Sequence, residues 1–246
     1  MENCFINMKN VNMSYPSAVY NATTLKQVIF SKLKFEKPKV LLKDVCALHN
    51  FSLEAKTGDR IGVIGHNGAG KSTLLKTIAG IYPLEAGSLE VKGKIRALFD
   101  ISLGFDLEST GRENILYRGL LLGATPNEIK EKTEEIISFA DIGEFIDYPV
   151  KSYSTGMLVR LAFAVSTSLS GDILLLDEVV SAGDSNFQVK ARKRIYNLID
   201  ESKIMVFVSH DLSTIKEVCN KVILLQKGCI ISQGKPDDVI NLYKSK

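Results

Sequence analysis

The chain has 246 residues, of which 45% are hydrophobic and 24% charged, a composition typical of a globular protein with room for one sizeable core. Its 31 basic and 28 acidic side chains leave a net charge of +3, which is too small to indicate a nucleic-acid-binding protein. No apolar stretch approaches the roughly 18 to 20 residues that span a bilayer, and the N-terminus lacks the basic and apolar segments of an export signal.

The first part of the chain is predicted to be mostly strand. A polar, lysine-bearing stretch at 16–40 separates the first two predicted strands. The alternation of apolar and polar residues, with glycines between the last short antiparallel strands, predicts strands at 2–15, 47–54, 60–64 and within 84–95.

From residue 110 the apolar spacing becomes helical. Helices are predicted at 112–122, 126–140, 155–170, 185–201 and 236–243. Wholly apolar runs at 172–176 and 204–208 are typical of buried parallel strands, and 222–225 with 229–232 predicts a hairpin. The helical middle therefore interrupts an α/β core, which predicts a single domain with two lobes.

The four cysteines predict no metal site. Cys4, Cys46, Cys219 and Cys229 are scattered and form no C-x-x-C pair. They are interpreted as reduced, mostly packed thiols in a cytosolic protein.

One segment fills every position of the phosphate-binding pattern G-x-x-x-x-G-K-[ST]. It follows an apolar strand and opens into a helical run, which is the context that the pattern requires. Its residues are Gly65, His66, Asn67, Gly68, Ala69, Gly70, Lys71, Ser72 and Thr73. The glycines let backbone N–H groups converge on a polyphosphate, Lys71 is predicted to reach its β- and γ-phosphates, and Ser72 is predicted to bind Mg²⁺. The sequence therefore predicts a nucleoside triphosphate and Mg²⁺ as ligands.

Two buried strands are followed by residues suited to phosphate chemistry. Asp177 and Glu178 end the run 173–176, where ligands lie in open α/β sheets. Asp177 is predicted to hold Mg²⁺, directly or through water, and Glu178 to activate the attacking water. His210 follows 204–208 and is predicted to approach the γ-phosphate, although a histidine there is also a common turn residue.

Tyr153-Ser154-Thr155-Gly156-Met157 resembles the Leu-Ser-Gly-Gly-Gln signature of ATP-binding-cassette ATPases. Ser154 and Gly156 keep the pattern, while Tyr153, Thr155 and Met157 depart from it. A hydroxyl, a glycine and a helix N-terminus form a second anion site. The order of phosphate loop, signature, Asp177-Glu178, Ser181-Ala182-Gly183-Asp184 and His210 is similar to that family across essentially the whole chain.

The resemblance implies a fold and an assembly. The expected fold is an α/β P-loop NTPase domain with a RecA-like core, an antiparallel β-subdomain and an inserted helical subdomain. One domain would span 1–246, with an N-terminal insertion at about 16–40 and the helical subdomain at about 100–170. Two copies would pair head to tail, so that Ser154, Thr155 and Gly156 of each close over the other's ATP, with Asp184 at the interface.

Two positions of the family pattern each have two candidate residues in this sequence. No glutamine occurs in 100–109, where most cassette ATPases have one that contacts Mg²⁺; Asp100 is the best substitute by position, and Ser102 is the alternative. Tyr15 is the first choice for the aromatic that stacks on adenine, and Tyr20 the second. The stretch 16–40 resembles an insertion that faces lipid headgroups or a membrane partner; a solvated hairpin is the alternative.

Residues 153–165, 177–188 and 103–114 are similar to ATPases of polysaccharide exporters, which serve O-antigen, capsule and teichoic-acid export. The expected protein is a homodimeric motor subunit at the cytoplasmic face of the inner membrane. It would dock on two copies of a separate integral-membrane permease that handles lipid-linked polysaccharide, and no nucleic acid is expected. No sugar-binding domain is expected after the last helix. The alternatives are an importer or drug-exporter motor, a soluble cassette ATPase acting on DNA or ribosomes, and a nucleotide-binding module without turnover.

Overall fold

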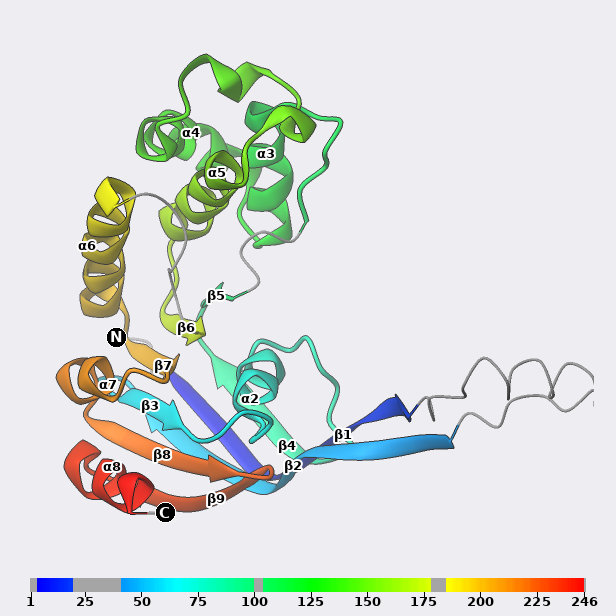
Figure 1. The fold of residues 1–246 in the computed structure, drawn as a ribbon, viewed down its shortest axis with the longest axis vertical. Coiled ribbons are helices and arrows are strands. Elements are labelled where there is room, and N and C mark those ends of the chain that lie inside the picture. The colour runs from blue at the N-terminus through cyan, green and yellow to red at the C-terminus, as the bar shows by residue number, and fades with distance from the viewer. Residues whose placement is uncertain (1–3, 20–40, 100–103, 178–184, 246) are drawn as a thin grey trace, which may run out of the picture.

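The computed structural model describes residues 4–19, 41–99, 104–177 and 185–245, which form two sheets and a layer of helices (Figure 1). The strands are β1 (Phe5–Val19), β2 (Leu41–Lys56), β3 (Arg60–Ile64), β4 (Ala86–Lys92), β5 (Ile95–Leu98), β6 (Ile173–Asp177), β7 (Ile204–Val208), β8 (Lys221–Gln226) and β9 (Cys229–Gly234). The α-helices are α2 (Lys71–Ile78), α3 (Gly111–Leu121), α4 (Pro126–Ala140), α5 (Thr155–Ser168), α6 (Ser185–Glu201), α7 (Leu212–Val218) and α8 (Pro236–Lys244). Two short 3₁₀ turns, η1 (Gly143–Asp147) and η2 (Val150–Ser152), lie between α4 and α5.

The central sheet has six strands in the order β5-β6-β7-β3-β8-β9. All neighbours run parallel except β9, which is antiparallel to β8. Every residue of β7 and the first four of β6 are buried. Apolar side chains cover both faces of these strands, which is why their sequences are apolar without alternation.

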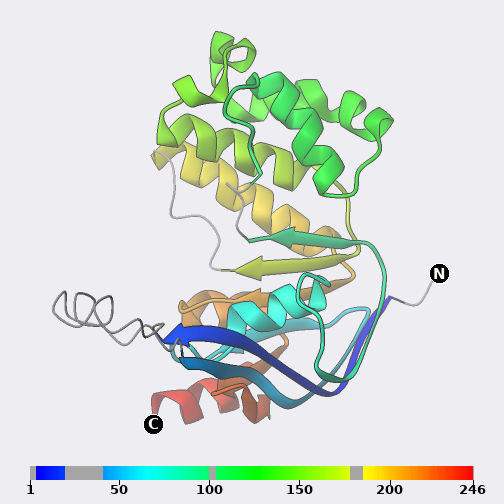
Figure 2. The ribbon, with the colours of Figure 1, turned by 90° about the vertical axis from the view of Figure 1, so that its right-hand side faces the viewer.

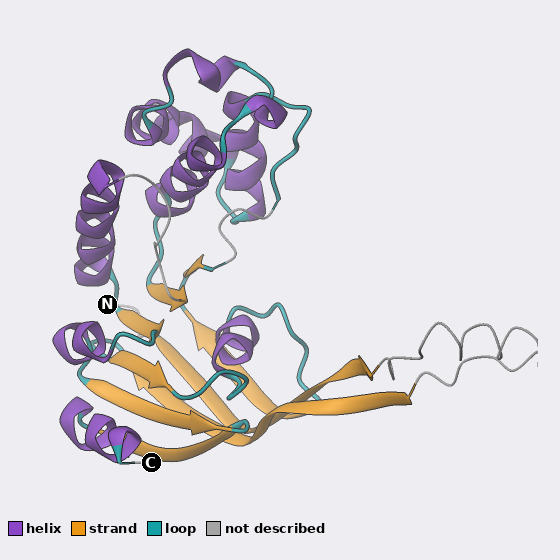
Figure 3. Cartoon of the chain, in the orientation of Figure 1, coloured by secondary structure: helices purple, strands orange, loops and turns teal. Residues whose placement is uncertain are grey.

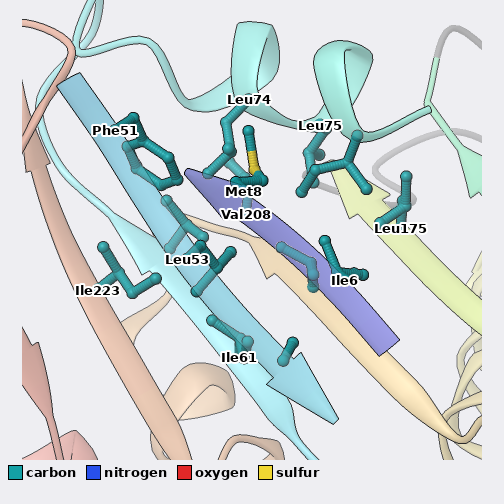
Figure 4. Packing of buried hydrophobic residues seen from close by; sticks show 14 of the residues in the cluster. Ile6, Met8, Phe51, Leu53, Ile61, Leu74, Leu75, Leu175, Val208 and Ile223 are labelled. Carbon is teal, nitrogen blue, oxygen red and sulfur yellow. The ribbon is translucent and has the colours of Figure 1, made fainter. Parts of the chain in front are cut away.

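The second sheet is antiparallel, with β1 between β2 and β4. Helix α2 and the apolar face of this sheet pack against one face of the central sheet in the largest cluster of the core. Figure 4 shows Leu74 and Leu75 of α2 reaching toward Met8 of β1 beneath the helix. The helix that leaves the phosphate loop is thus held between the two sheets.

Helices α3, α4 and α5 form a layer of their own, inserted between β5 and β6 (Figures 2 and 3). Capping boxes begin two of them: Thr110 with Glu113 at α3, and Thr125 with Glu128 at α4. A separate apolar cluster joins the three helices.

Among the described residues no helix combines the length and apolar character that crossing a membrane requires.

The structure extends and corrects several predictions. β1 and β2 continue beyond the expected strands and pair from Phe5–Lys56 out to Val19–Leu41, so the first residues of the lysine-bearing stretch, 16–19, are strand. Residues 84–95 were predicted as antiparallel strands, and β4 is one, but β5 at Ile95–Leu98 pairs in parallel with β6. Helix α7 was not predicted. The lysines at 20–40 lie outside the described residues.

Candidate nucleotide site

The phosphate loop connects β3 to α2 and owes its shape to glycine. Gly65, Gly68 and Gly70 have φ values of 152°, 75° and 104°. A Cβ on Gly65 would lie 2.2 Å from the carbonyl oxygen of Leu225, and one on Gly70 would lie 2.3 Å from that of Ala47. These two positions therefore exclude a side chain, because backbone carbonyl groups of β8 and β2 lie directly against the loop.

Lys71 and the start of α2 make the loop attractive to anions. The Lys71 side chain is buried, and its Nζ donates hydrogen bonds to the carbonyl oxygens of Gly65 at 2.7 Å and His66 at 3.1 Å. No side chain caps α2, whose N-cap is Gly70. A helix N-terminus without a capping group, beside an ammonium group, is suited to bind phosphate oxygens.

A cavity of about 240 Å³ opens over this loop. Of the residues predicted for the site, it is lined by Tyr15, Asn67, Gly68, Ala69, Gly70, Lys71, Ser72, Thr73, Asp177 and His210. The sequence analysis missed four further residues of its wall, namely Val45, Cys46, Ala47 and Val208. Val45 of β2 lies opposite Tyr15 of β1, and Cys46 and Ala47 follow Val45 along β2. The pairing of the first two strands was therefore the signal that could have placed these three residues near Tyr15. Tyr15 is 43% exposed, which leaves its ring open to a planar base.

Sheet order brings the two distant polar residues to the loop. β7 lies between β3 and β6, and Asp177 at the end of β6 pairs with Val208 at the end of β7. His210 follows two residues after Val208. The carboxyl ends of three neighbouring parallel strands therefore deliver the phosphate loop, Asp177 and His210 to one cavity.

The turn that carries His210 is held by Asp211. The Asp211 carboxylate accepts hydrogen bonds from the backbone N–H of Ser213 at 3.0 Å and from the Thr214 hydroxyl at 2.5 Å, and so caps α7. Side-chain hydrogen bonds from Ser213 and Thr214 lower the pKa of Asp211 to about 2. The carboxylate stays ionised at neutral pH, and the turn behind His210 stays capped.

Two loop residues lie differently from the others. Gly65 and His66 offer their carbonyl oxygens to Lys71, and neither lines the cavity. The His66 ring instead packs at 5.3 Å from the ring of Tyr243 on α8.

The signature residues belong to the helical layer. Ser154 caps α5, its hydroxyl oxygen accepting a hydrogen bond from the Met157 N–H at 3.2 Å, and Thr155 and Gly156 form the first turn. None of the three lines the cavity over the phosphate loop. The chain thus presents two anion-attracting helix starts in different parts of the fold.

Tyr153 anchors this helix start. Its hydroxyl donates a hydrogen bond to the carbonyl oxygen of Phe145 at 2.7 Å, and burial raises its pKa. A Cβ on Gly111 would lie 2.1 Å from the Tyr153 oxygen, so the first residue of α3 has to be a glycine for the tyrosine to fit.

The oxygen donors around the cavity fit a magnesium ion. Ser72 and Asp177 both line the cavity, and hydroxyl and carboxylate oxygens are the ligands that Mg²⁺ prefers. No group of three or more His, Cys, Asp or Glu side chains within the described ranges could hold a metal alone. Asp100, Ser102, Glu178, Asp184 and Tyr20 lie outside the described residues.

Comparisons with known proteins address the family directly. The sequence profile of the ABC transporter family matches residues 48–181. The O-antigen export system ATP-binding protein RfbE of Yersinia enterocolitica is 44% identical over 233 residues, which cover 92% of this chain and 96% of that protein. The teichoic acids export ATP-binding protein TagH of Lactococcus lactis is 43% identical over 202 residues, which cover 82% of this chain and 43% of that longer protein.

Solved structures confirm the expected fold class. A dimeric ATP-binding cassette in a post-hydrolysis state, bound to ADP and Pi, matches with a TM-score of 0.68 at 20% identity, over 94% of this chain and 98% of that one. An ATP-binding subunit of an ABC transporter matches with a TM-score of 0.69 at 17% identity, over 98% of this chain and 93% of that one. On the profile and the sequence relatives together, the chain belongs to the ABC transporter family.

Proposed function

We propose that this chain is the ATP-hydrolysing motor subunit of an exporter of lipid-linked polysaccharide. The observation that carries the ATPase part is the cavity that joins the phosphate loop to Asp177 and His210. The relatives named for O-antigen and teichoic-acid export support the choice of cargo.

Each residue of the site has a separate role in the proposed hydrolysis. Lys71 exchanges its contacts with the Gly65 and His66 carbonyls for phosphate oxygens, and the N–H groups of residues 67–73 surround those oxygens. Ser72 and Asp177 would hold Mg²⁺, which supplies positive charge against the developing negative charge of phosphoryl transfer. Glu178, the next residue after Asp177, accepts a proton from the attacking water, and His210 orients that water.

Hydrolysis is proposed to require two copies of the chain. Ser154, Thr155 and Gly156 lie in the helical layer, away from the cavity over their own phosphate loop. Head-to-tail pairing would place each signature over the other copy's nucleotide, with Asp100 and Asp184 as further candidates for contact. The dimeric state of a solved structure with the same fold supports this arrangement.

The motor is proposed to act from the cytoplasmic face of the inner membrane, beneath two copies of an integral-membrane permease. Closure of the dimer on ATP and opening after hydrolysis would alternate the access of the polysaccharide path. The permease would select the glycan.

A gene replacement tests this function. Cells in which Glu178→Gln replaces the native residue should retain undecorated polymer on the cytoplasmic side, because the motor binds ATP and does not turn it over. Purified Glu178→Gln protein should hydrolyse ATP roughly 10²–10⁴-fold more slowly than the native protein. The matched control is Glu90→Gln, an exposed acid on β4, which should leave surface glycan and hydrolysis unchanged.

Two outcomes would contradict the proposal in different ways. Normal surface glycan with failed uptake of a nutrient would replace the exporter by an importer. Unchanged hydrolysis by Glu178→Gln would remove Glu178 from the chemistry.

A further inference from the structure

A second cavity, of about 410 Å³, lies between the helical layer and the core. It is bordered by α4 and the end of α5 from the helical layer, and by the start of β5 and the end of α6 from the core. Its volume falls within the range of about 300–1,000 Å³ typical of small-molecule sites. It shares no lining residue with the nucleotide cavity.

The most unusual group in its wall is Arg96 of β5. Its Nε is enclosed and has no hydrogen-bond partner among the described residues. Gly171 makes this burial possible, because a Cβ there would lie 2.7 Å from the Cβ of Arg96. Burial lowers the pKa of Arg96 to about 10, so the guanidinium stays charged at neutral pH while it has lost much of its hydration. A partly desolvated charge without a paired carboxylate costs free energy that a bound anion would recover.

The other charges of the cavity largely neutralise one another. Lys94 pairs with Glu128 at 3.6 Å, and Lys132 pairs with Glu135 at 2.9 Å. Arg194 shares the same Glu135 carboxylate and also donates to the hydroxyl of Ser168 at 3.2 Å. Lys94, Lys132 and Arg194 therefore share the two carboxylates of Glu128 and Glu135.

The two remaining acids of the cavity, Glu131 and Glu201, are exposed to solvent. Glu201 acts electrostatically on Arg96, and its exposure leaves that carboxylate hydrated and screened. The wall thus carries four cations and four acids, and Arg96 is the cation that forms no ion pair with a carboxylate among the described residues.

We propose that this cavity binds a small oxyanion, a phosphate or carboxylate group, on the guanidinium of Arg96. An arginine presents parallel N–H donors that match the oxygens of either group. Since the cavity joins the helical layer to the core, a ligand there bridges the two layers.

The test is an NMR titration of protein labelled with ¹⁵N-arginine, with saturating ADP so that the phosphate loop is occupied. The Arg96 Nε–H signal is assigned by its loss in Arg96→Lys. Inorganic phosphate and, separately, acetate are added at constant ionic strength set with sodium chloride. Phosphate or acetate should shift the Arg96 signal in a saturable way, and the anion that does so identifies the group bound.

A thermal-unfolding series provides the matched controls. The effective anion should raise the Tm of native protein by a few degrees, with a smaller rise in Arg96→Lys and none in Arg96→Gln. Arg192→Gln, an exposed arginine of α6 outside the cavity, should behave as native. An Arg96 signal that neither anion moves, or an equal rise in Tm for native protein and Arg96→Gln, would overturn the proposal.

Discussion

Gly70 and Gly68 occupy the same loop with positive φ, but their surroundings differ. A Cβ on Gly70 would lie 2.3 Å from the Ala47 backbone, whereas one on Gly68 would have no atom within 4 Å. Gly68→Ala should therefore cost only the left-handed strain of about 1–2 kcal/mol. Gly70→Ala must also displace the loop and should weaken ATP binding more than roughly tenfold, or about 1.4 kcal/mol. Calorimetric titration of both variants checks this difference; equal affinities would contradict it.

The cysteines differ in reactivity in a way that reports on the nucleotide site. Cys46 is exposed in the wall of the cavity, whereas burial raises the pKa of Cys219 to about 12 and also raises that of Cys4. Because the thiolate is the reactive form, iodoacetamide should modify Cys46 well before these two. ATP with EDTA should slow that modification by covering the thiol.

Peptide mass spectrometry measures the modification of each cysteine. Cys46→Ser supplies the control, since ATP should then have no effect on the remaining thiols. Modification of Cys46 at the same rate with and without ATP would place the adenine elsewhere than beside Tyr15.

At the scale of elements, Gly111 and Tyr153 join the start of α3 to the start of α5. Gly111→Ala would force its methyl group against the Tyr153 hydroxyl and should destabilise the protein by about 1–3 kcal/mol. Tyr153→Phe loses the hydrogen bond to Phe145, worth about 0.5–1.5 kcal/mol, but removes the oxygen that clashes.

The double variant should therefore be more stable than the sum of the two single losses predicts. Urea unfolding of the four proteins gives this coupling. Strict additivity would mean that the two residues do not contact each other.

At the scale of the whole molecule, the separation of the signature from the phosphate loop predicts assembly driven by nucleotide. Purified Glu178→Gln should convert from monomer to dimer when Mg-ATP is added, because bound ATP persists between the two surfaces. Light scattering measures the mass. Adding Lys71→Ala to the same protein should abolish the change by removing the phosphate contact. A Glu178→Gln protein that stays monomeric at high concentration would contradict unaided pairing of the motor.

Several elements were predictable because their signals are local. The helices α4 and α6 follow from apolar spacing with caps or charged faces, and the apolar runs of β6 and β7 follow from burial on both faces. The partner of β5 could not be predicted, because a strand of four residues carries no information on its direction. Helix α7, with seven residues, is too short for a helical period to be recognised.

The sequence by itself determined the phosphate loop, because nine consecutive residues with a preceding strand and a following helix specify a local backbone shape. It also indicated Asp177 and His210 as candidates by their positions after buried strands. Only the tertiary structure decided that they meet, since the order β6-β7-β3 arises from long-range strand pairing. The same is true of Val45 and Cys46 in the cavity wall, and of Arg96, whose enclosed Nε results from packing between layers that are distant in the chain.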